Sequence, residues 1–286
     1  MRKSLITTAV LGALAAPSFV FAADAAPASD LTVSYNVGLY SQYIFRGLTQ
    51  TNKEPAIQGG VDLSHSSGFY LGAWGTNISW LKDNAAQATA SSDNPGNSFY
   101  TKGGSMELDI YGGYKQTFGS GLGIDLGILQ YYYPGKLAPD TAKANTTELY
   151  GALSYGWIQA KVSSVVSKGA WTVGKTTAVP GSTDARGTYY AEINATIPVS
   201  DLIGAKDGFG SGITALAHVG RQDFDAGSVN NPFSYTDYKI GLQKSFDNGV
   251  NIGGYWTSTN TKTTHWTVAG RNIGDDTGTV YVQKTF

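Results

Sequence analysis

The sequence predicts an all-β protein: a transmembrane, antiparallel, up-and-down β-barrel of about twelve strands. Three observations predict this fold. Apolar side chains alternate with polar or small ones, short and long connectors alternate between these segments, and Gly and aromatic residues are abundant. Of 286 residues, 37 are Gly, 18 Tyr, 11 Phe and 6 Trp. The mean hydropathy is slightly negative, so the apolar residues are dispersed along the chain rather than gathered into helical membrane spans.

Composition and charge exclude several other classes of protein. The aromatic content is too high for a disordered chain, and at 14% charged residues the chain is too weakly charged for a coiled coil. The absence of Cys excludes disulfides, thiolate metal sites and a cysteine nucleophile. Basic and acidic residues number 20 and 21, so charge does not predict a nucleic-acid partner.

The first 22 residues have the pattern of a secretory signal peptide. Arg2 and Lys3 precede an apolar stretch over 5–16, and Val20, Phe21 and Ala22 form a small-residue cleavage pattern. We therefore expect a signal peptide over 1–22 and one barrel domain over 23–286. An exported chain without Cys fits the envelope of a Gram-negative bacterium.

The predicted strands follow one another along the mature chain with a period of two. In the first, the apolar residues Leu31, Val33, Tyr35, Val37 and Leu39 alternate with Thr, Ser, Asn and Gly, which gives one apolar and one polar face. The same alternation predicts eleven further strands, over 57–64, 69–79, 106–115, 122–128, 148–155, 158–163, 189–197, 213–220, 235–246, 250–257 and 279–286.

The connectors between these strands alternate in length. Tight, Gly-containing turns are predicted at 66–68, 119–121, 156–157 and 247–249, and long polar loops at 41–55, 81–104, 134–146, 167–187, 222–234 and 258–277. The segment 198–211 is an exception, because it is long where a short turn is expected. Short periplasmic turns and long extracellular loops are typical of outer-membrane barrels, and an even strand count places both termini at the short-turn end.

Aromatic residues gather near the predicted strand ends, as the interfacial girdles of a membrane barrel require. The expected girdle comprises Tyr40, Tyr43, Trp80, Tyr131 and Trp256 toward the long loops, and Trp157, Phe246 and Phe286 toward the short turns. The alternative is a soluble, lipocalin-like barrel with its apolar face inside. Such a barrel does not explain the aromatic clusters or the regular alternation of connector lengths.

Polar residues on the opposite phase are expected to line the lumen. They are Asp62, Glu107, Asp109, Lys115, Asp125, Glu148, Lys161, Glu192, His218, Asp237 and Lys239. Four of the acids (Glu107, Asp109, Glu148 and Asp237) should lie near the outer mouth, which favours a mild cation preference. The alternative is a lumen plugged by salt bridges between these charges.

No catalytic, metal or cofactor site is predicted. Of the three His, only His218 lies within a strand, and it has no partner motif for nucleophilic catalysis. The Gly-rich stretches at 119–123 and 208–212 lack the Lys-Ser/Thr of a phosphate loop and are expected to be turns. We therefore expect no enzyme activity and no cofactor.

Several stretches resemble the TorF family of porins of Gram-negative bacteria. They are 35–37 (YNV), 41–50 (SQYIFRGLTQ), 55–62 (PAIQGGVD), 68–72 (GFYLG) and 107–114 (ELDIYGGY). The resemblance covers the mature chain and is sharpest in its first half. It implies an outer-membrane channel but no particular solute. The terminal Phe286, in an alternating strand, resembles the signal that the barrel assembly machinery recognises, whereas Lys284 departs from the usual apolar residue.

These observations together predict a porin-like channel for passive diffusion of small hydrophilic solutes or ions, surrounded by outer-membrane lipid and lipopolysaccharide. Two other functions stay open. One is a closed structural or adhesin-type barrel whose extracellular loops bind a partner. The other, more distant, is an envelope hydrolase that depends on His218.

Overall fold

The computed structural model describes residues 30–87, 100–137, 144–171, 184–205, 207–224, 233–268 and 270–286. The predicted signal peptide over 1–22 lies outside the described residues. Within the described residues, no helix is both long and apolar enough to span a membrane.

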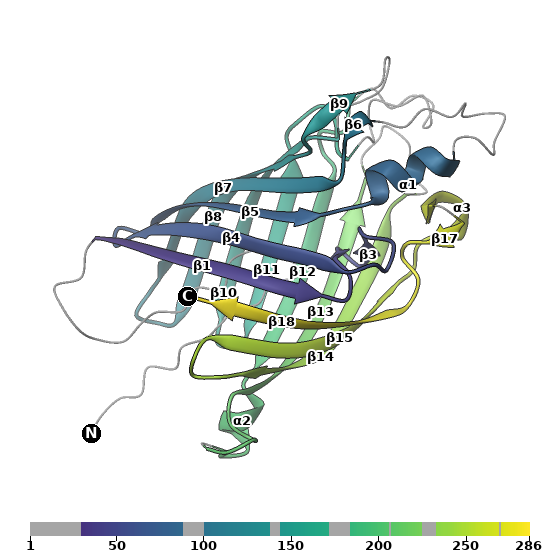
Figure 1. The fold of residues 1–286 in the computed structure, drawn as a ribbon. Coiled ribbons are helices and arrows are strands. Elements are labelled where there is room, and N and C mark those ends of the chain that lie inside the picture. Colours follow the sequence, from purple (N-terminus) through teal and green to yellow (C-terminus); the bar gives the residue numbers. More distant parts are fainter. Residues whose placement is uncertain are drawn as a thin grey trace.

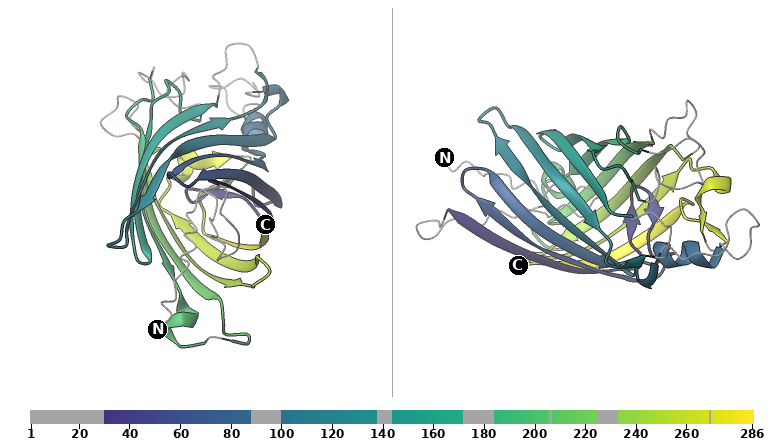
Figure 2. Two further views of the ribbon diagram at one scale, coloured as in Figure 1. Left: turned by 90° about the vertical axis from the view of Figure 1, so that its left-hand side faces the viewer. Right: turned by 90° about the horizontal axis from the view of Figure 1, so that it is seen from above.

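Twelve antiparallel strands close into a barrel, as predicted (Figures 1 and 2). In chain order they are β1 (Leu31–Tyr40), β4 (Ala56–His65), β5 (Phe69–Asn77), β7 (Met106–Thr117), β8 (Leu122–Tyr132), β10 (Thr146–Tyr155), β11 (Ile158–Val165), β12 (Tyr189–Ile197), β13 (Ile213–Asp223), β14 (Tyr235–Ser245), β15 (Val250–Thr259) and β18 (Thr277–Thr285). Each strand pairs with its neighbours along the chain, and β18 closes the barrel against β1.

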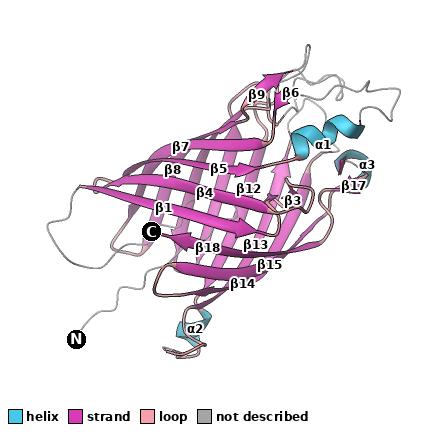
Figure 3. Cartoon of the chain, viewed as in Figure 1, coloured by secondary structure: helices cyan, strands magenta, loops and turns pink. Residues whose placement is uncertain are grey.

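The smaller elements lie mainly at the long-loop end of the barrel (Figure 3). These are β2 (Ile44–Phe45), β3 (Leu48–Thr49), α1 (Trp80–Gln87), β6 (Tyr100–Gly103), β9 (Gly135–Leu137), α3 (Thr263–Trp266), β16 (Thr267–Val268) and β17 (Arg271–Asn272). At the opposite end, the long connector between β12 and β13 contains α2 (Val199–Leu202). Ser200 Oγ donates to the carbonyl of Gly210 and accepts from the amide of Ile213, so this connector is a structured unit.

The outward face of the barrel is apolar. Leu153, Ile193 and Val280 are 57%, 53% and 66% exposed, and the other outward positions are mainly apolar or small. On the barrel strands that the structure describes, the charged outward residues are Arg221, Asp223, Lys244 and Lys284. Closure pairs the backbone of every barrel strand on both sides, so the wall has no free edge. An apolar exterior of this extent requires a lipid environment.

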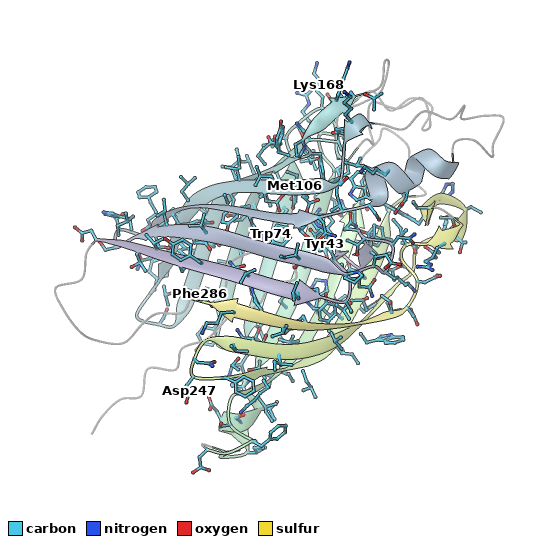
Figure 4. All side chains as sticks on the ribbon, viewed as in Figure 1. Tyr43, Trp74, Met106, Lys168, Asp247 and Phe286 are labelled. Atoms are coloured by element: carbon cyan, nitrogen blue, oxygen red, sulfur yellow. The ribbon has the colours of Figure 1, made fainter. Side chains whose placement is uncertain are left out.

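The tight turns lie where the sequence predicts them. In the two-residue turn between β10 and β11, Gly156 has a φ of +58°, a conformation that Gly adopts without steric cost. The C-terminus lies at the same end of the barrel as these turns, and Figure 4 shows Phe286 and Asp247 there and Lys168 at the opposite end. The alternation of connector lengths therefore separates two distinct ends.

Candidate functional site

The lumen is the candidate functional site, and its wall carries all eleven polar residues predicted to line it. Seven of them are buried: Asp62, Glu107, Asp109, Glu148, Glu192, His218 and Asp237. The other four are half-buried and reach solvent inside the barrel: Lys115, Asp125, Lys161 and Lys239. Because these residues share the phase opposite to the exposed apolar residues, strand alternation alone brings them to one inner surface.

Aromatic rings on this inner wall lie over glycines of the neighbouring strand. Tyr150 on β10 is directly opposite Gly127 on β8, and its ring fills the space that a Cβ on Gly127 would take. The same arrangement recurs in the pairs Tyr111–Gly72, Tyr70–Gly113 and Tyr281–Gly253. These rings therefore lie along the wall, over the glycines of the neighbouring strand.

The hydroxyls of these tyrosines hold acidic residues in place on one side of the lumen. Tyr111 donates to Asp62 Oδ1 at 2.6 Å, and Tyr70 donates to Asp125 Oδ1 at 2.7 Å. The Lys161 ammonium lies 4.4 Å from the ring centre of Tyr150. A cation over an aromatic face is stabilised by the quadrupole of the ring, so Tyr150 holds the Lys161 ammonium at a fixed position on this wall.

A second polar network lies on β12, β13 and β14. Both ring nitrogens of His218 face oxygens: Nδ1 is 2.7 Å from Asn194 Oδ1, and Nε2 is 2.9 Å from Asp237 Oδ1. The Tyr190 hydroxyl donates to Asp237 Oδ2 at 2.8 Å, and Asn194 donates to Glu192 Oε2 at 2.8 Å. The partners of His218 lie on separate strands, Asn194 on β12 and Asp237 on β14, so they form no motif that the sequence around His218 could show. Within the described residues, its contacts include no Ser, Thr or Cys nucleophile.

Segment 41–55, predicted to be an external loop, folds into the lumen. Its short hairpin, β2 and β3, turns at Arg46 and Gly47, which have φ angles of +47° and +79°. Arg46 is 1% exposed and donates to Gln222 Oε1 at 2.7 Å and Glu148 Oε2 at 2.8 Å. It also lies 4.3 Å from the ring centre of Tyr190. The hairpin leaves the wall between β1 and β4 and is anchored on β10 and β13, so it crosses the barrel.

Further contacts fasten this lumen segment along its length. Gln42 donates to Thr277 Oγ1 at 2.8 Å, and the amide of Thr49 donates to the carbonyl of Ile273 at 2.9 Å. Tyr43 donates to Glu107 Oε1 at 2.7 Å. Burial, with the nearby Glu107, raises the pKa of the Tyr43 hydroxyl well above its ordinary value, so Tyr43 remains a neutral donor. Its ring lies 5.6 Å from that of Trp74 (Figure 4).

Two apolar clusters flank the lumen segment. Tyr43 and Phe45 belong to the larger one, with residues of β5, β7, β8 and α1, and Leu48 belongs to the smaller one, with Phe224, Tyr235, Val268 and Ile273. The long-loop end of the lumen is therefore filled by the segment and the rings around it. The sequence does contain a signal for this hairpin, since residues 44–49 (IFRGLT) form a hairpin pattern with apolar arms.

These contacts correct the prediction that four acids line the outer mouth. Glu107 accepts from Tyr43 and Tyr133, Glu148 accepts from Arg46 and Tyr131, and Asp237 accepts from Tyr190. These three acids anchor buried groups and do not line an open mouth. The fourth, Asp109, is buried, and its Oδ1 has no hydrogen-bond partner in the described structure. The long-loop end of the lumen is thus filled mainly by aromatic rings and hydrogen-bonded groups. Among the described residues, Arg46 and Glu148 form a salt bridge in this part of the lumen.

Comparison with known families places the chain. Residues 24–286 match the model of a family described as "Bacterial protein of unknown function (Gcw_chp)". The chain belongs to this family. No curated protein matches this Gcw_chp chain.

Solved structures similar to this Gcw_chp chain include three outer-membrane proteins. "KdgM porin" matches with a TM-score of 0.46 and 9% identity over 89% of this chain and 98% of its own. "NanC porin" matches with a TM-score of 0.46 and 8% identity over 89% and 99%. Pseudomonas aeruginosa OccK5 (OpdH) matches with a TM-score of 0.39 and 13% identity over 91% and 68%. Because these scores lie below 0.5, the architecture rests on the strand pairing itself.

Four of the eight predicted girdle residues of the Gcw_chp chain do not face the lipid, which corrects the prediction. Tyr43, Trp80 and Tyr131 are buried, and Tyr40 stacks on the inward Tyr281 with ring centres 5.0 Å apart. The prediction used the position along each strand, but the strand phase directs Tyr40 and Tyr131 inward. The remaining four lie on the outer surface: Trp157, Phe246, Trp256 and Phe286. Among the described residues, no group of three or more His, Asp or Glu is arranged to hold a metal ion.

Proposed function

We propose that this chain is a TorF-family porin: an outer-membrane channel for passive diffusion of small hydrophilic solutes, exported through a signal peptide over 1–22. The observation that carries the proposal is a closed twelve-stranded wall with an apolar exterior and a polar interior. Such a wall meets both requirements of a membrane channel, because lipid contacts only apolar side chains and the interior offers hydrogen bonds to water.

The part of the lumen between the lumen segment and the short-turn end offers a path for small solutes. Twelve strands at a spacing of ~4.8 Å and a tilt of ~40° give a backbone diameter of ~24 Å. Side chains from opposite walls narrow this width, but the tyrosines that lie flat over glycines limit how far they project. Lys115, Asp125, Lys161 and Lys239 reach solvent inside this part of the barrel. A lumen of this kind suits small hydrophilic solutes and excludes folded proteins.

A closed structural barrel is the second candidate, because the lumen segment is almost inaccessible to solvent. Arg46, Thr49 and Thr51 are each 1% exposed. A channel requires either a narrow passage beside this segment or its displacement. A closed barrel requires neither, and its function would then rest on the long loops as a surface for a partner.

Conductance of the purified protein in planar lipid bilayers distinguishes these candidates, with Arg46→Ala as the test variant. Removing Arg46 leaves Glu148 buried without its charge partner, and breaking a buried pair in this way costs about 3–5 kcal/mol. The hairpin should then leave the opposite wall and the conductance should rise several-fold. Arg186→Ala is the matched control, since Arg186 is exposed and pairs only with Asp184 among the described ion pairs.

Liposome swelling in sugars of graded size provides an independent readout. A channel should admit a monosaccharide faster than a trisaccharide, and Arg46→Ala should accelerate both. Absence of conductance and of swelling in the wild-type protein and in Arg46→Ala would contradict the channel and favour the closed barrel. We expect no hydrolase activity. A hydrolase that depends on His218 would instead show an activity that is lost when His218 is replaced.

A further inference from the structure

The outer wall has an apolar groove on the side formed by β8, β10, β11, β12 and β13. Its volume is about 600 Å³, and its lining includes Leu126, Gly151, Val162, Ala191 and Arg221. Gly151, Ala160 and Ala191 project little side chain, whereas the larger outward residues Leu153, Ile193 and Val219 stand beside them. The groove therefore results from small residues on an otherwise bulky lipid-facing surface.

Strand register places five of the residues that line the groove in one row across the wall. Leu126 is opposite Gly151, Gly151 opposite Val162, Val162 opposite Ala191, and Ala191 opposite Arg221. This row crosses five strands, and four strand spacings correspond to ~19 Å. One leaflet of a bilayer has a hydrocarbon depth of about 15 Å, half of the core thickness. This row of lining residues is thus about as long as one acyl chain.

A positive charge stands at one end of this row. Arg221 has a side chain that is 45% exposed, and its nearest carboxylate oxygen, on Asp223, is 3.5 Å away. A guanidinium has five donors in a planar fork, which suits a phosphate group, and one loose contact leaves most of them available. Thr236, which also lines the groove, adds a hydroxyl beside it.

The other outward cations are placed differently. Lys244 donates to the Ser211 carbonyl and Lys284 to the Asn248 carbonyl, and both belong to the short-turn end of their strands. Arg221 lies two residues before the long-loop end of β13. In an outer-membrane barrel this end faces the outer leaflet, so the anionic group that Arg221 meets belongs to an outer-leaflet lipid.

We infer that this groove binds one acyl chain of lipid A, the phosphorylated glycolipid of the outer leaflet, and that Arg221 holds its phosphate. The inference rests on the outer-membrane location in the proposed function. It adds a specific lipid site to the lipid contact that any membrane barrel has. Apolar contact along the row supplies affinity for the chain, and the guanidinium supplies selectivity for the phosphate.

Native mass spectrometry of the detergent-purified protein with added synthetic lipid A tests this inference. The wild-type protein should retain one lipid A and retain phosphatidylglycerol at least tenfold less. Arg221→Gln should lower retention of lipid A about tenfold, because the charge-assisted hydrogen bonds to the phosphate are lost. Gly151→Leu should lower retention of lipid A as well, because its side chain fills the groove. The barrel should tolerate this change, since the atom nearest to an added Cβ is at the flexible end of the Leu126 side chain. Lys284→Gln is the matched control and should retain lipid A like the wild type.

Three results would overturn the site: equal retention of the two lipids, equal loss in Lys284→Gln, or undiminished retention in both groove variants. Heat-shifted migration on gels shows whether each variant is folded, and Ala191→Leu replaces Gly151→Leu if the latter fails to fold. Failure of the proposed function gives a different result, because the protein would then be missing from outer-membrane fractions or lack conductance. Arg221→Gln should leave conductance unchanged, since Arg221 lies outside the lumen.

Discussion

Individual glycines on the inner wall determine how the tyrosines lie. At Gly127, a Cβ would lie 2.8 Å from the backbone oxygen of Gly112 and would overlap the ring of Tyr150. Tyr150 cannot easily move away, because its hydroxyl is hydrogen-bonded to Tyr70 and the Lys161 ammonium lies over its ring. The absence of a side chain at position 127 is therefore a packing requirement of the lumen wall.

Gly127→Ala should destabilise the barrel. The added methyl group meets a fixed ring and a backbone oxygen, and overpacking of this kind costs about 1–3 kcal/mol. Urea unfolding of the protein in lipid vesicles, followed by Trp fluorescence, measures the change in free energy of unfolding. Gly278→Ala is the control, because an outward Cβ there meets only Trp256 at 3.6 Å and should have little effect. Equal stability of Gly127→Ala and wild type would contradict the packing argument.

Among the secondary-structure elements, β18 is the one that closes the barrel. It pairs with β15 through eight residue pairs but with β1 through only five. Beyond β18, the backbone of Phe286 extends the seam by exchanging hydrogen bonds with Tyr35, at 2.9 and 3.3 Å. The Phe286 side chain itself is 68% exposed, so it contributes little to packing within the barrel. Its proposed role is recognition by the barrel assembly machinery.

Phe286→Ala should therefore affect assembly more than stability. The amount of heat-modifiable, folded protein in outer-membrane fractions should fall several-fold, because the side chain that the machinery is proposed to bind is missing. The purified, refolded variant should unfold within about 0.5 kcal/mol of the wild type, as for other surface substitutions. Phe246→Ala, at another outward aromatic of the same end, is the control. Equal losses in the two variants would indicate a general effect of removing an interfacial aromatic residue.

The hairpin of β2 and β3 shows how a short element can change the character of the whole lumen. Its Gly47 packs so closely against β14 that a Cβ would lie 2.6 Å from the Cβ of Asp237. Arg46, with its positive φ, places a guanidinium between Glu148 and Gln222. Because of this hairpin of four paired residues, the long-loop end of the lumen is a filled, mainly aromatic constriction. The sequence predicts an open acidic mouth there instead.

For the molecule as a whole, the lumen charge predicts ion selectivity. The inner wall and lumen segment carry eight acids (Glu54, Asp62, Glu107, Asp109, Asp125, Glu148, Glu192 and Asp237) and five bases (Arg46, Lys53, Lys115, Lys161 and Lys239) within the described residues. An excess of acids attracts cations. The bases that solvent reaches oppose this effect, so the proposed cation preference is mild.

Reversal potentials in a salt gradient across a planar bilayer measure this preference. The wild-type channel should favour potassium over chloride. Lys161→Gln should strengthen the preference and Asp125→Asn should weaken it, since both side chains are half-buried in the lumen. Lys284→Gln, on the outward face, should not alter it. A channel selective for anions would contradict the prediction.

The sequence by itself determined the barrel wall, because each strand's alternation is a local property: residues 31, 33 and 35 share a face whatever the rest of the chain does. Strand number and the inward phase of residues such as Lys161 and His218 follow from that period, and the two ends follow from the alternation of connector lengths. Tertiary structure alone decided what fills the lumen. Arg46 meets Glu148 and Gln222, which are 102 and 176 residues away. His218 meets partners on two other strands. Strand register and barrel closure bring these groups together, and neither can be derived from spacing along a single strand.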